Sequence, residues 1–148
     1  MASTYAVRYD AIVLGVGTMG AAACLALARR GQRILGLEQF DIPHTLGSHH
    51  GHSRMFRLAY YEHPDYVPLL RRSLAMWHAL NSESRSEVFI TTGGIYIGRP
   101  DRPALAGALS SARRHGIAHE LLDRAELAHR FPQFRVGEWA LGLYEPDA

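Results

Sequence analysis

The sequence predicts an α/β fold that opens with a βαβ unit. Residues 10–14 form a short, mostly apolar run that ends at a glycine, which is typical of a buried parallel strand. Residues 18–30 are rich in alanine and leucine, and Gly31 stands where a helix would end. Residues 33–38 have the pattern of a second strand and close on an acid. These parts fit within about 30 residues, the length of one βαβ unit.

Composition narrows the class of protein. The 148 residues allow one domain with its own core, and the contents of 47% hydrophobic and 20% charged residues are ordinary for a soluble globular chain. A net charge of +2 gives no argument for a nucleic-acid partner. No run approaches the roughly 18 apolar residues of a membrane helix, and residues 1–10 lack the apolar core of a signal peptide. We therefore expect a cytoplasmic protein with no nucleic-acid or membrane partner.

The reactive side chains are few. All 16 cationic residues are arginines, which excludes a Schiff-base lysine and a P-loop lysine from this chain. The single cysteine, Cys24, excludes an intramolecular disulfide and lies in an apolar run. We expect it to be a small buried packing residue.

Residues 39–64 lose the periodicity of the βαβ unit. They are dense in His, Gly, Ser, Pro and Arg, and a loop of this length is usually functional or disordered. Helical spacing then returns with Asp65 as the expected N-cap and a core-facing stripe of Tyr66, Leu70, Leu74 and Trp77. The later pattern predicts strands at 88–92 and 95–97, a helix at 103–115, a strand at 117–122 and a capping-box helix at 123–130.

A GxGxxG motif joins the first strand to the first helix. In such a motif the first glycine permits a tight turn, the second lets a pyrophosphate approach the backbone, and the third lets helix and strand pack closely. The phosphates then meet free amide groups and the positive end of the helix dipole. The candidate cofactor-binding residues of the motif are Gly15, Gly17, Thr18, Met19 and Gly20.

Glu38 completes the dinucleotide-binding pattern. It lies 18 residues beyond Gly20, at the end of the second strand, where a carboxylate accepts hydrogen bonds from the adenosine ribose hydroxyls. A standard NAD-binding domain would follow its second strand with another helix and a third parallel strand. This chain runs instead into the polar segment 39–64, which favours FAD as the cofactor.

The segment His44-Thr45-Leu46-Gly47-Ser48-His49-His50-Gly51-His52-Ser53-Arg54-Met55-Phe56-Arg57 resembles the monomeric sarcosine oxidase and N-methyltryptophan oxidase family. These are FAD enzymes of the D-amino-acid-oxidase fold. The resemblance covers the whole chain, because the glycine motif, Glu38, Tyr66-Val67-Pro68-Leu69 and Thr92-Gly93 also match. One departure is His52, where the nearest relatives tend to carry an acid, so the local charge differs there.

The resemblance implies an FAD-binding, Rossmann-like βαβ start of the D-amino-acid-oxidase type, followed by the beginning of a mixed α+β substrate domain. The fold would be incomplete, with the chain as the N-terminal part of an FAD-dependent oxidoreductase domain. We expect residues 1–57 to form the FAD-binding βαβ unit and the flavin loop. Residues 58–148 would form helices and strands that start the remainder.

The resemblance also implies roles for individual residues. His50 and Arg54 would lie close to the flavin ring as catalytic residues, and Arg57 would help to hold the substrate carboxylate. Ser48 and Ser53 would contact FAD, as would Arg54. A guanidinium matches a carboxylate bidentately, and a cation beside a flavin stabilises its anionic reduced ring. Without the resemblance, both arginines would be interpreted as solvated loop residues.

The implied reaction is oxidation of the carbon–nitrogen bond of a secondary amine or N-methyl amino acid, with O2 reduced to H2O2. The substrate would be a small carboxylate-bearing secondary amine. In this family the flavin-attachment cysteine and the oxygen-activating lysine come from later in the chain, so we expect these 148 residues alone to be inactive. Two alternatives stay open: an FAD dehydrogenase with another electron acceptor, and a non-catalytic or degenerate dinucleotide-binding fragment.

A metal site is a further alternative for the histidine-rich segment, which contains His44, His49, His50 and His52. Imidazole is a common metal ligand. However, no acid or cysteine lies among these histidines, and adjacent side chains point in different directions. We therefore expect no metal.

Overall fold

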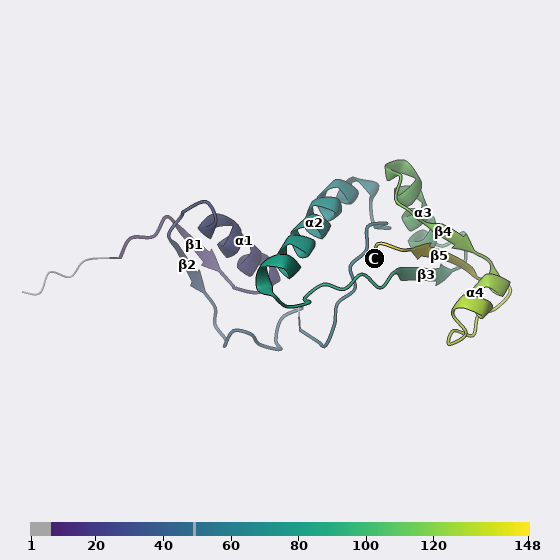
Figure 1. The fold of residues 1–148 in the computed structure, drawn as a ribbon, viewed down its shortest axis with the longest axis horizontal. Helices are drawn as coiled ribbons and strands as arrows, with labels where there is room; N and C mark the ends of the chain where they lie inside the picture. Colours follow the sequence, from purple (N-terminus) through teal and green to yellow (C-terminus); the bar gives the residue numbers. More distant parts are fainter. Residues whose placement is uncertain (1–6, 49) are drawn as a thin grey trace, which may run out of the picture. The chain divides into compact units, whose positions relative to one another are not determined.

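The computed structural model describes residues 7–48 and 50–148. It divides into two compact units, which we call unit 1 (Met1–Arg54) and unit 2 (Met55–Ala148). Figure 1 shows the helices and strands of each unit along the chain.

Unit 1 is the expected βαβ unit. It consists of β1 (Ala11–Leu14), α1 (Thr18–Ala28) and β2 (Ile34–Leu37). The two strands pair in parallel along their whole length, and the α1 crossover connects them. The Rossmann-like start that the sequence predicts is thereby confirmed. Compared with the expected ranges, β1 begins one residue later, α1 ends two residues earlier and β2 is one residue shorter at each end.

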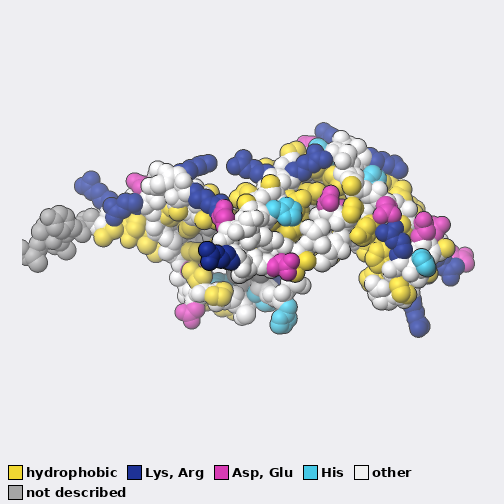
Figure 2. Space-filling model, viewed as in Figure 1, with side chains coloured by type: hydrophobic (Ala, Val, Ile, Leu, Met, Phe, Trp, Pro, Cys, Tyr) yellow, Lys and Arg dark blue, Asp and Glu magenta, His cyan; other side chains and the backbone are white. Residues whose placement is uncertain are grey.

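Unit 1 leaves much of its apolar surface uncovered. Ile12 is 59% exposed and Leu14 is 80% exposed, and no residue of α1 is buried. Hydrophobic side chains are correspondingly visible at the surface in Figure 2.

Cys24 is only half-buried, whereas the sequence predicts a buried residue. Its sulfur would lie 3.6 Å from a Cβ placed on Gly36, so the side chain packs towards β2.

Unit 2 contains a three-stranded antiparallel sheet with four helical segments. Its elements are η1 (Pro64–Tyr66), α2 (Val67–Ser84), β3 (Gly94–Gly98), α3 (Pro103–His115), β4 (Glu120–Leu122), α4 (Arg124–Arg130) and β5 (Leu141–Glu145). The strand order is β3-β5-β4, so the last strand lies in the middle. The sequence pattern predicts no strand after residue 130, so the central strand β5 corrects that expectation.

The two faces of this sheet bury two different clusters. Tyr96 and Leu143 lie opposite each other on β3 and β5 and pack with the α3 residues Leu105 and Ala108. Alternate residues of the same strands, including Ile95, pack instead with Leu122, Leu127 and Ala140 beside α4. This division follows from the period of two in a strand, which sends successive side chains to opposite faces.

Two local expectations for unit 2 are wrong. Asp65 does not cap the long helix, because a short 3-10 turn precedes it and the Nδ1 of His63 accepts the backbone N–H of Asp65 at 3.2 Å. α2 therefore begins at Val67. Of the expected apolar stripe, Leu70 and Leu74 do pack against the core, whereas Tyr66 is half exposed.

Residues 88–92 are not a strand either. The side-chain oxygen of Asn81, on α2, accepts the backbone N–H groups of Val88 and Phe89, each at 2.9 Å. Its amide nitrogen donates to the carbonyl of Phe89. One side chain thus takes the hydrogen bonds that a neighbouring strand would otherwise provide, and the ring of Phe89 stacks near Trp77. The expected helix at 103–115 is confirmed, with Gly116 as its C-cap at φ +58°, and Asp123 and Glu126 form the expected capping box. The strand expected at 117–122 is shorter and covers only Glu120–Leu122.

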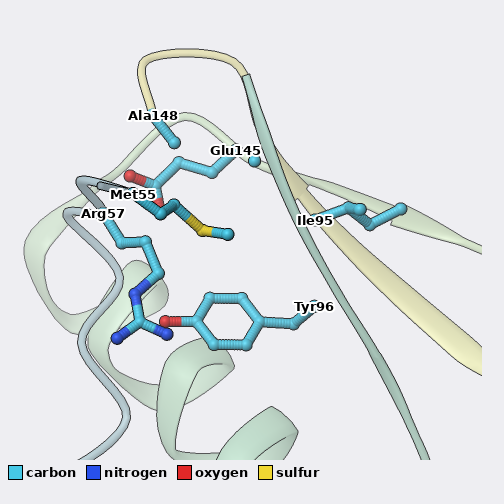
Figure 3. A pocket seen from close by; sticks show the side chains of 7 residues that line it. Met55, Arg57, Ile95, Tyr96, Glu145 and Ala148 are labelled. Carbon is cyan, nitrogen blue, oxygen red and sulfur yellow. The ribbon is translucent and has the colours of Figure 1, made fainter. Parts of the chain in front are cut away.

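The start of unit 2 lies against the sheet. Figure 3 shows Met55 and Arg57 beside Tyr96 of β3 and Glu145 of β5. The hydroxyl of Tyr96 donates to the carbonyl of Ala59 at 3.0 Å. These contacts connect residues that are distant in the sequence and form one wall of the site described below.

Asn81→Ala should destabilise unit 2 by about 1–3 kcal/mol, because the partly buried N–H and carbonyl of Phe89 lose their partner and the N–H of Val88 loses one of its two acceptors. Urea unfolding followed by tryptophan fluorescence would measure this, since Trp77 lies beside the affected segment. The control is Ser82→Ala, an exposed residue whose hydroxyl donates to His78 on its own helix. Its effect should stay within about 0.5 kcal/mol. Equal stabilities of the two variants would contradict this role of Asn81.

Candidate functional site

The glycine motif forms a compact turn between β1 and α1. Gly15 has φ +83°, a backbone conformation that favours glycine. A Cβ placed on Gly20 would lie 1.8 Å from the carbonyl oxygen of Gly15, so only glycine allows this approach of helix to turn. Gly17 is the N-cap of α1, and it has no side chain to occupy the amide groups of the first turn. Those amides and the helix dipole suit a phosphate.

Thr18 and Met19 open the helix, and both are exposed. Met19 is 84% exposed, so its side chain contributes little packing within unit 1. The structure thus places the five motif residues together at the turn and the first turn of α1, where the N–H of Gly15 donates to the carbonyl of Leu37. This is the geometry that the sequence predicts for a pyrophosphate-binding turn.

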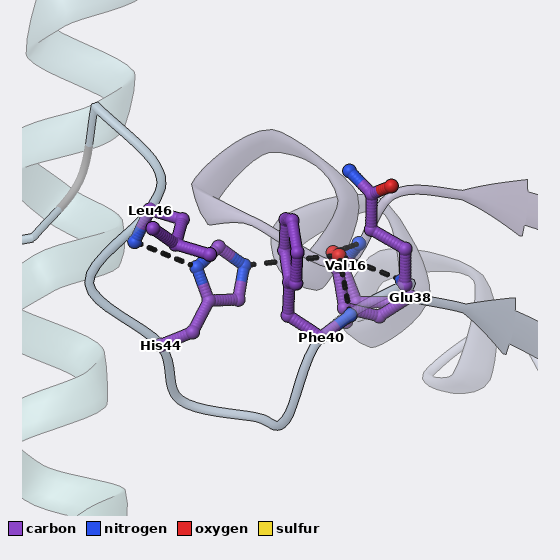
Figure 4. A network of polar contacts seen from close by, with 6 residues as sticks. Val16, Glu38, Phe40, His44 and Leu46 are labelled. Atoms are coloured by element: carbon purple, nitrogen blue, oxygen red, sulfur yellow. Dashed lines mark hydrogen bonds and ion pairs between the residues drawn. The ribbon is translucent and has the colours of Figure 1, made fainter.

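Glu38 is joined to this turn by hydrogen bonds, as Figure 4 shows. Its Oε2 accepts the backbone N–H of Val16 at 2.8 Å. Its Oε1 accepts the N–H groups of Gln39 at 2.9 Å and Phe40 at 3.4 Å. The hydrogen bond from Val16 is the main reason that the pKa of Glu38 lies below its ordinary value. The carboxylate therefore ties the end of β2 to the glycine turn.

His44 approaches the same carboxylate and was missed as a candidate residue of the cofactor site. Its Nε2 lies 3.7 Å from Oε1 of Glu38, and the two side chains are only 14% and 10% exposed. Because Nδ1 accepts the backbone N–H of Leu46 at 3.1 Å, the proton of a neutral ring resides on Nε2, which faces Glu38. The ring of Phe40 packs edge-on against His44. A loop histidine close in sequence to Glu38 was the available signal.

The predicted flavin-contacting residues lie in one loop of unit 1. Arg54 donates from Nη1 to the carbonyl of Ser53 at 2.8 Å and from Nη2 to the carbonyl of Ser48 at 3.0 Å. The Nδ1 of His50 lies 2.8 Å from the carbonyl of Gly47. All these polar side chains are exposed. The arginine thus holds the two ends of the loop together through their backbone.

Arg57 belongs to unit 2 and has a different environment. Its guanidinium carbon lies 5.3 Å from the ring centroid of Tyr96 and 5.5 Å from that of Tyr60, as cation–π contacts. It borders a small pocket of about 60 Å³, which is lined by Met55, Arg57, Gly94, Ile95, Tyr96, Glu145 and Ala148. Among the described residues, the ion pairs do not include Arg57.

The other polar groups of this pocket are Tyr96 and Glu145. Burial raises the pKa of Tyr96 to about 12, with the positive charge of Arg57 acting in the opposite direction. Glu145 is 1% exposed, and its carboxylate accepts the backbone N–H groups of Leu58 at 2.5 Å and Ala59 at 2.9 Å. Sequence reasoning missed Glu145, because nothing local marks a carboxylate whose partners lie 86 and 87 residues away.

No group of three His, Cys, Asp or Glu side chains that could hold a metal ion occurs within residues 7–48 and 50–148. His49, one of the four histidines considered for a metal cluster, lies outside the described residues. In the same part of the chain, no helix has the length and apolar character required to span a membrane.

Comparisons with known proteins identify the family of the chain. The family described as DAO, FAD dependent oxidoreductase, matches residues 10–148. The chain is 44% identical to the monomeric sarcosine oxidase of Streptomyces avermitilis, over 95% of this chain and 36% of that protein. It is 38% identical to the N-methyl-L-tryptophan oxidase of Citrobacter koseri, over 95% of this chain and 38% of that protein.

Solved structures support the fold. The open form of NikD, described as an unusual amino acid oxidase essential for nikkomycin biosynthesis, matches with a TM-score of 0.79 and 26% identity. The match covers 94% of this chain and 36% of that structure. L-proline dehydrogenase from P. horikoshii matches with a TM-score of 0.75 at 20% identity, which shows the shared fold alone.

The chain spans little more than a third of the length of these relatives. Within that span, the D-amino-acid-oxidase type of fold, the resemblance to the two oxidases and FAD as the family's cofactor are confirmed. The glycine turn, Glu38 and the loop that follows them lie within residues 10–148, the span that the family model matches. The chain belongs to the DAO family of FAD-dependent oxidoreductases.

Proposed function

We propose that the protein oxidises the carbon–nitrogen bond of a carboxylate-bearing secondary amine, such as an N-methyl amino acid, with O2 as the electron acceptor and H2O2 as a product. The observation that carries this proposal is the environment of Arg57. Its guanidinium borders a pocket, stacks on two tyrosine rings and has no acidic partner among the described residues. A carboxylate is the ligand that such a planar cation matches best.

The residues of unit 1 suit the nucleotide part of FAD. The backbone amides at Gly17, Thr18, Met19 and Gly20 would hold the pyrophosphate, while Gly15, whose own N–H donates to the carbonyl of Leu37, would shape the turn. The Glu38 carboxylate, already held in place by three backbone N–H groups, would accept hydrogen bonds from the adenosine ribose. Bound FAD supplies the hydride acceptor for the amine and passes the electrons on.

The loop residues would serve the flavin end. In the proposal Ser48 and Ser53 contact FAD, while His50 and Arg54 lie beside its ring. The guanidinium of Arg54 donates to two loop carbonyls, and these two hydrogen bonds would keep its positive charge at a fixed place. A fixed cation there would stabilise negative charge that develops on the cofactor.

Arg57 would orient the substrate. With the carboxylate bound to the guanidinium, the amine and its N-methyl group would extend from that anchor in one direction. The neighbouring Met55 and Tyr96 side chains give the pocket wall apolar surface, which suits an alkyl substituent. The sarcosine and N-methyltryptophan oxidases that resemble this chain support a substrate of this class.

Glu38→Ala should weaken FAD binding by about 10- to 150-fold, the range expected when a hydrogen bond to a charged group is lost. FAD titration of the full-length protein, followed by flavin fluorescence, would measure the change. Asp41→Ala removes an exposed carboxylate from the same loop and should leave the affinity unchanged. Equal affinity of Glu38→Ala and the parent protein would remove Glu38 from the cofactor site.

Arg57→Ala and Arg54→Ala should have different kinetic consequences in the full-length protein. Arg57→Ala should raise KM for the amine by about 10- to 150-fold and weaken carboxylate inhibitors, because it removes a charge-assisted contact. Arg54→Ala should instead slow flavin reduction and alter the flavin spectrum. Arg72→Ala, an exposed arginine of α2, is the control. The same profile for the first two variants would contradict separate roles.

The 148-residue chain by itself should bind FAD weakly and produce no H2O2 from N-methyl amino acids. It spans 36% of the sarcosine oxidase that it resembles, and half of the residues of β1 and β2 are exposed while none is buried. Flavin content and peroxide release from purified chain would test this, with the Streptomyces avermitilis oxidase as the positive control. Stoichiometric FAD together with turnover would show that this expectation is wrong.

A further inference from the structure

We propose that Glu145 is a positioning residue for Arg57: its buried carboxylate fixes the backbone that carries the guanidinium and leaves the positive charge free for a ligand. This inference rests on the proposed function, in which Arg57 binds the substrate carboxylate. Glu145 itself would act through Arg57, and its effect would appear in substrate binding.

The first support is the burial of Glu145 and the place of its partners. The carboxylate is 1% exposed at the end of β5, and it accepts the N–H groups of Leu58 and Ala59. These are the two residues that follow Arg57 directly. A charge in such an environment requires several donors, and charge-assisted bonds to backbone amides are short and strong. The backbone next to Arg57 is therefore attached to the sheet.

Two further side chains hold the same stretch. The hydroxyl of Tyr96, on β3, donates to the carbonyl of Ala59 at 3.0 Å. The hydroxyl of Ser111, on α3, donates to the carbonyl of Tyr60. Three consecutive residues after Arg57 are thus bonded to three different elements of unit 2. A ligand-binding side chain works best when surrounding groups fix it in this way.

The second support is the direction of the charges. In Figure 3 the guanidinium of Arg57 points to the hydroxyl end of Tyr96, whereas the Glu145 carboxylate lies at the backbone side of the segment. Both oxygens of Glu145 accept from amides. The nearby acid is thereby engaged with the backbone, and the cation stacks on aromatic rings instead of forming an ion pair with it. An incoming carboxylate then meets an available guanidinium.

Glu145→Gln is the direct test in the full-length, FAD-loaded protein. Glutamine keeps one acceptor oxygen but turns an NH2 group towards a backbone N–H, so one of the two bonds is lost. We expect the Kd of propionate, measured from the flavin absorbance, to rise about tenfold or more, with kcat within about threefold of the parent value. Glu138→Gln is the matched control, because its side chain is 91% exposed.

A double-mutant cycle separates positioning from general stability. If Glu145 acts through Arg57, adding Glu145→Gln to Arg57→Ala should not weaken propionate binding further. A merely structural role would make the two losses add. In the parent protein, hydrogen exchange at the amides of Leu58 and Ala59 should be slow, and in Glu145→Gln it should become faster at these two positions.

Tyr96→Phe provides a second variant if Glu145→Gln does not fold. It removes the bond to Ala59 and keeps the ring beneath Arg57, so propionate should bind about 2- to 12-fold more weakly. The inference would be overturned if Arg57→Ala weakens propionate binding while every folded variant of Glu145 and Tyr96 binds propionate as the parent protein does. Unchanged binding in Arg57→Ala would instead overturn the carboxylate-binding role of Arg57, and the inference with it.

Discussion

Backbone N–H groups that donate to a glutamate carboxylate organise both units of the chain. In unit 1 Glu38 receives the N–H of Val16 and so joins the end of β2 to the glycine turn. In unit 2 Glu145 receives two successive N–H groups and so attaches the segment after Arg57 to β5. In each case a short irregular segment, which could adopt many conformations alone, is fixed by one side chain at a strand end. The residues proposed to contact cofactor and substrate depend on these two attachments.

The two arginines of the Arg-x-x-Arg sequence show how three residues of separation lead to different chemistry. Arg54 donates its N–H groups to loop carbonyls, which leaves its charge in place but occupies much of its hydrogen-bonding capacity. Arg57 lies over tyrosine rings, which attract the cation without using its in-plane donors. The first arrangement suits an electrostatic role, and the second suits direct binding of an anion. This contrast supports the proposed division of roles between them.

Features that depend on neighbours in the sequence were predictable. The glycine turn, the carboxylate that closes β2 and the capping box at Asp123 follow from local spacing. Features that depend on distant partners were not. The strand expected at residues 88–92 had suitable side chains, but Asn81 takes its hydrogen bonds, and the central strand β5 is short and interrupted by Gly142. β5 becomes the central strand only because β3 and β4 pair with it on either side. The partners of Glu145 likewise lie more than 80 positions away in the sequence.

The hydrogen bonds of Glu38 also bear on the order of assembly. The carboxylate is held by three backbone N–H groups in the protein alone, so the proposed ribose-binding group is placed during folding. The entropy lost in fixing this side chain is then incurred before the cofactor arrives. The adenosine half of FAD would meet a surface already complementary to it. Association would begin at that half, and the slower adjustment during loading would fall to the exposed loop around Arg54, where the isoalloxazine ring would settle last.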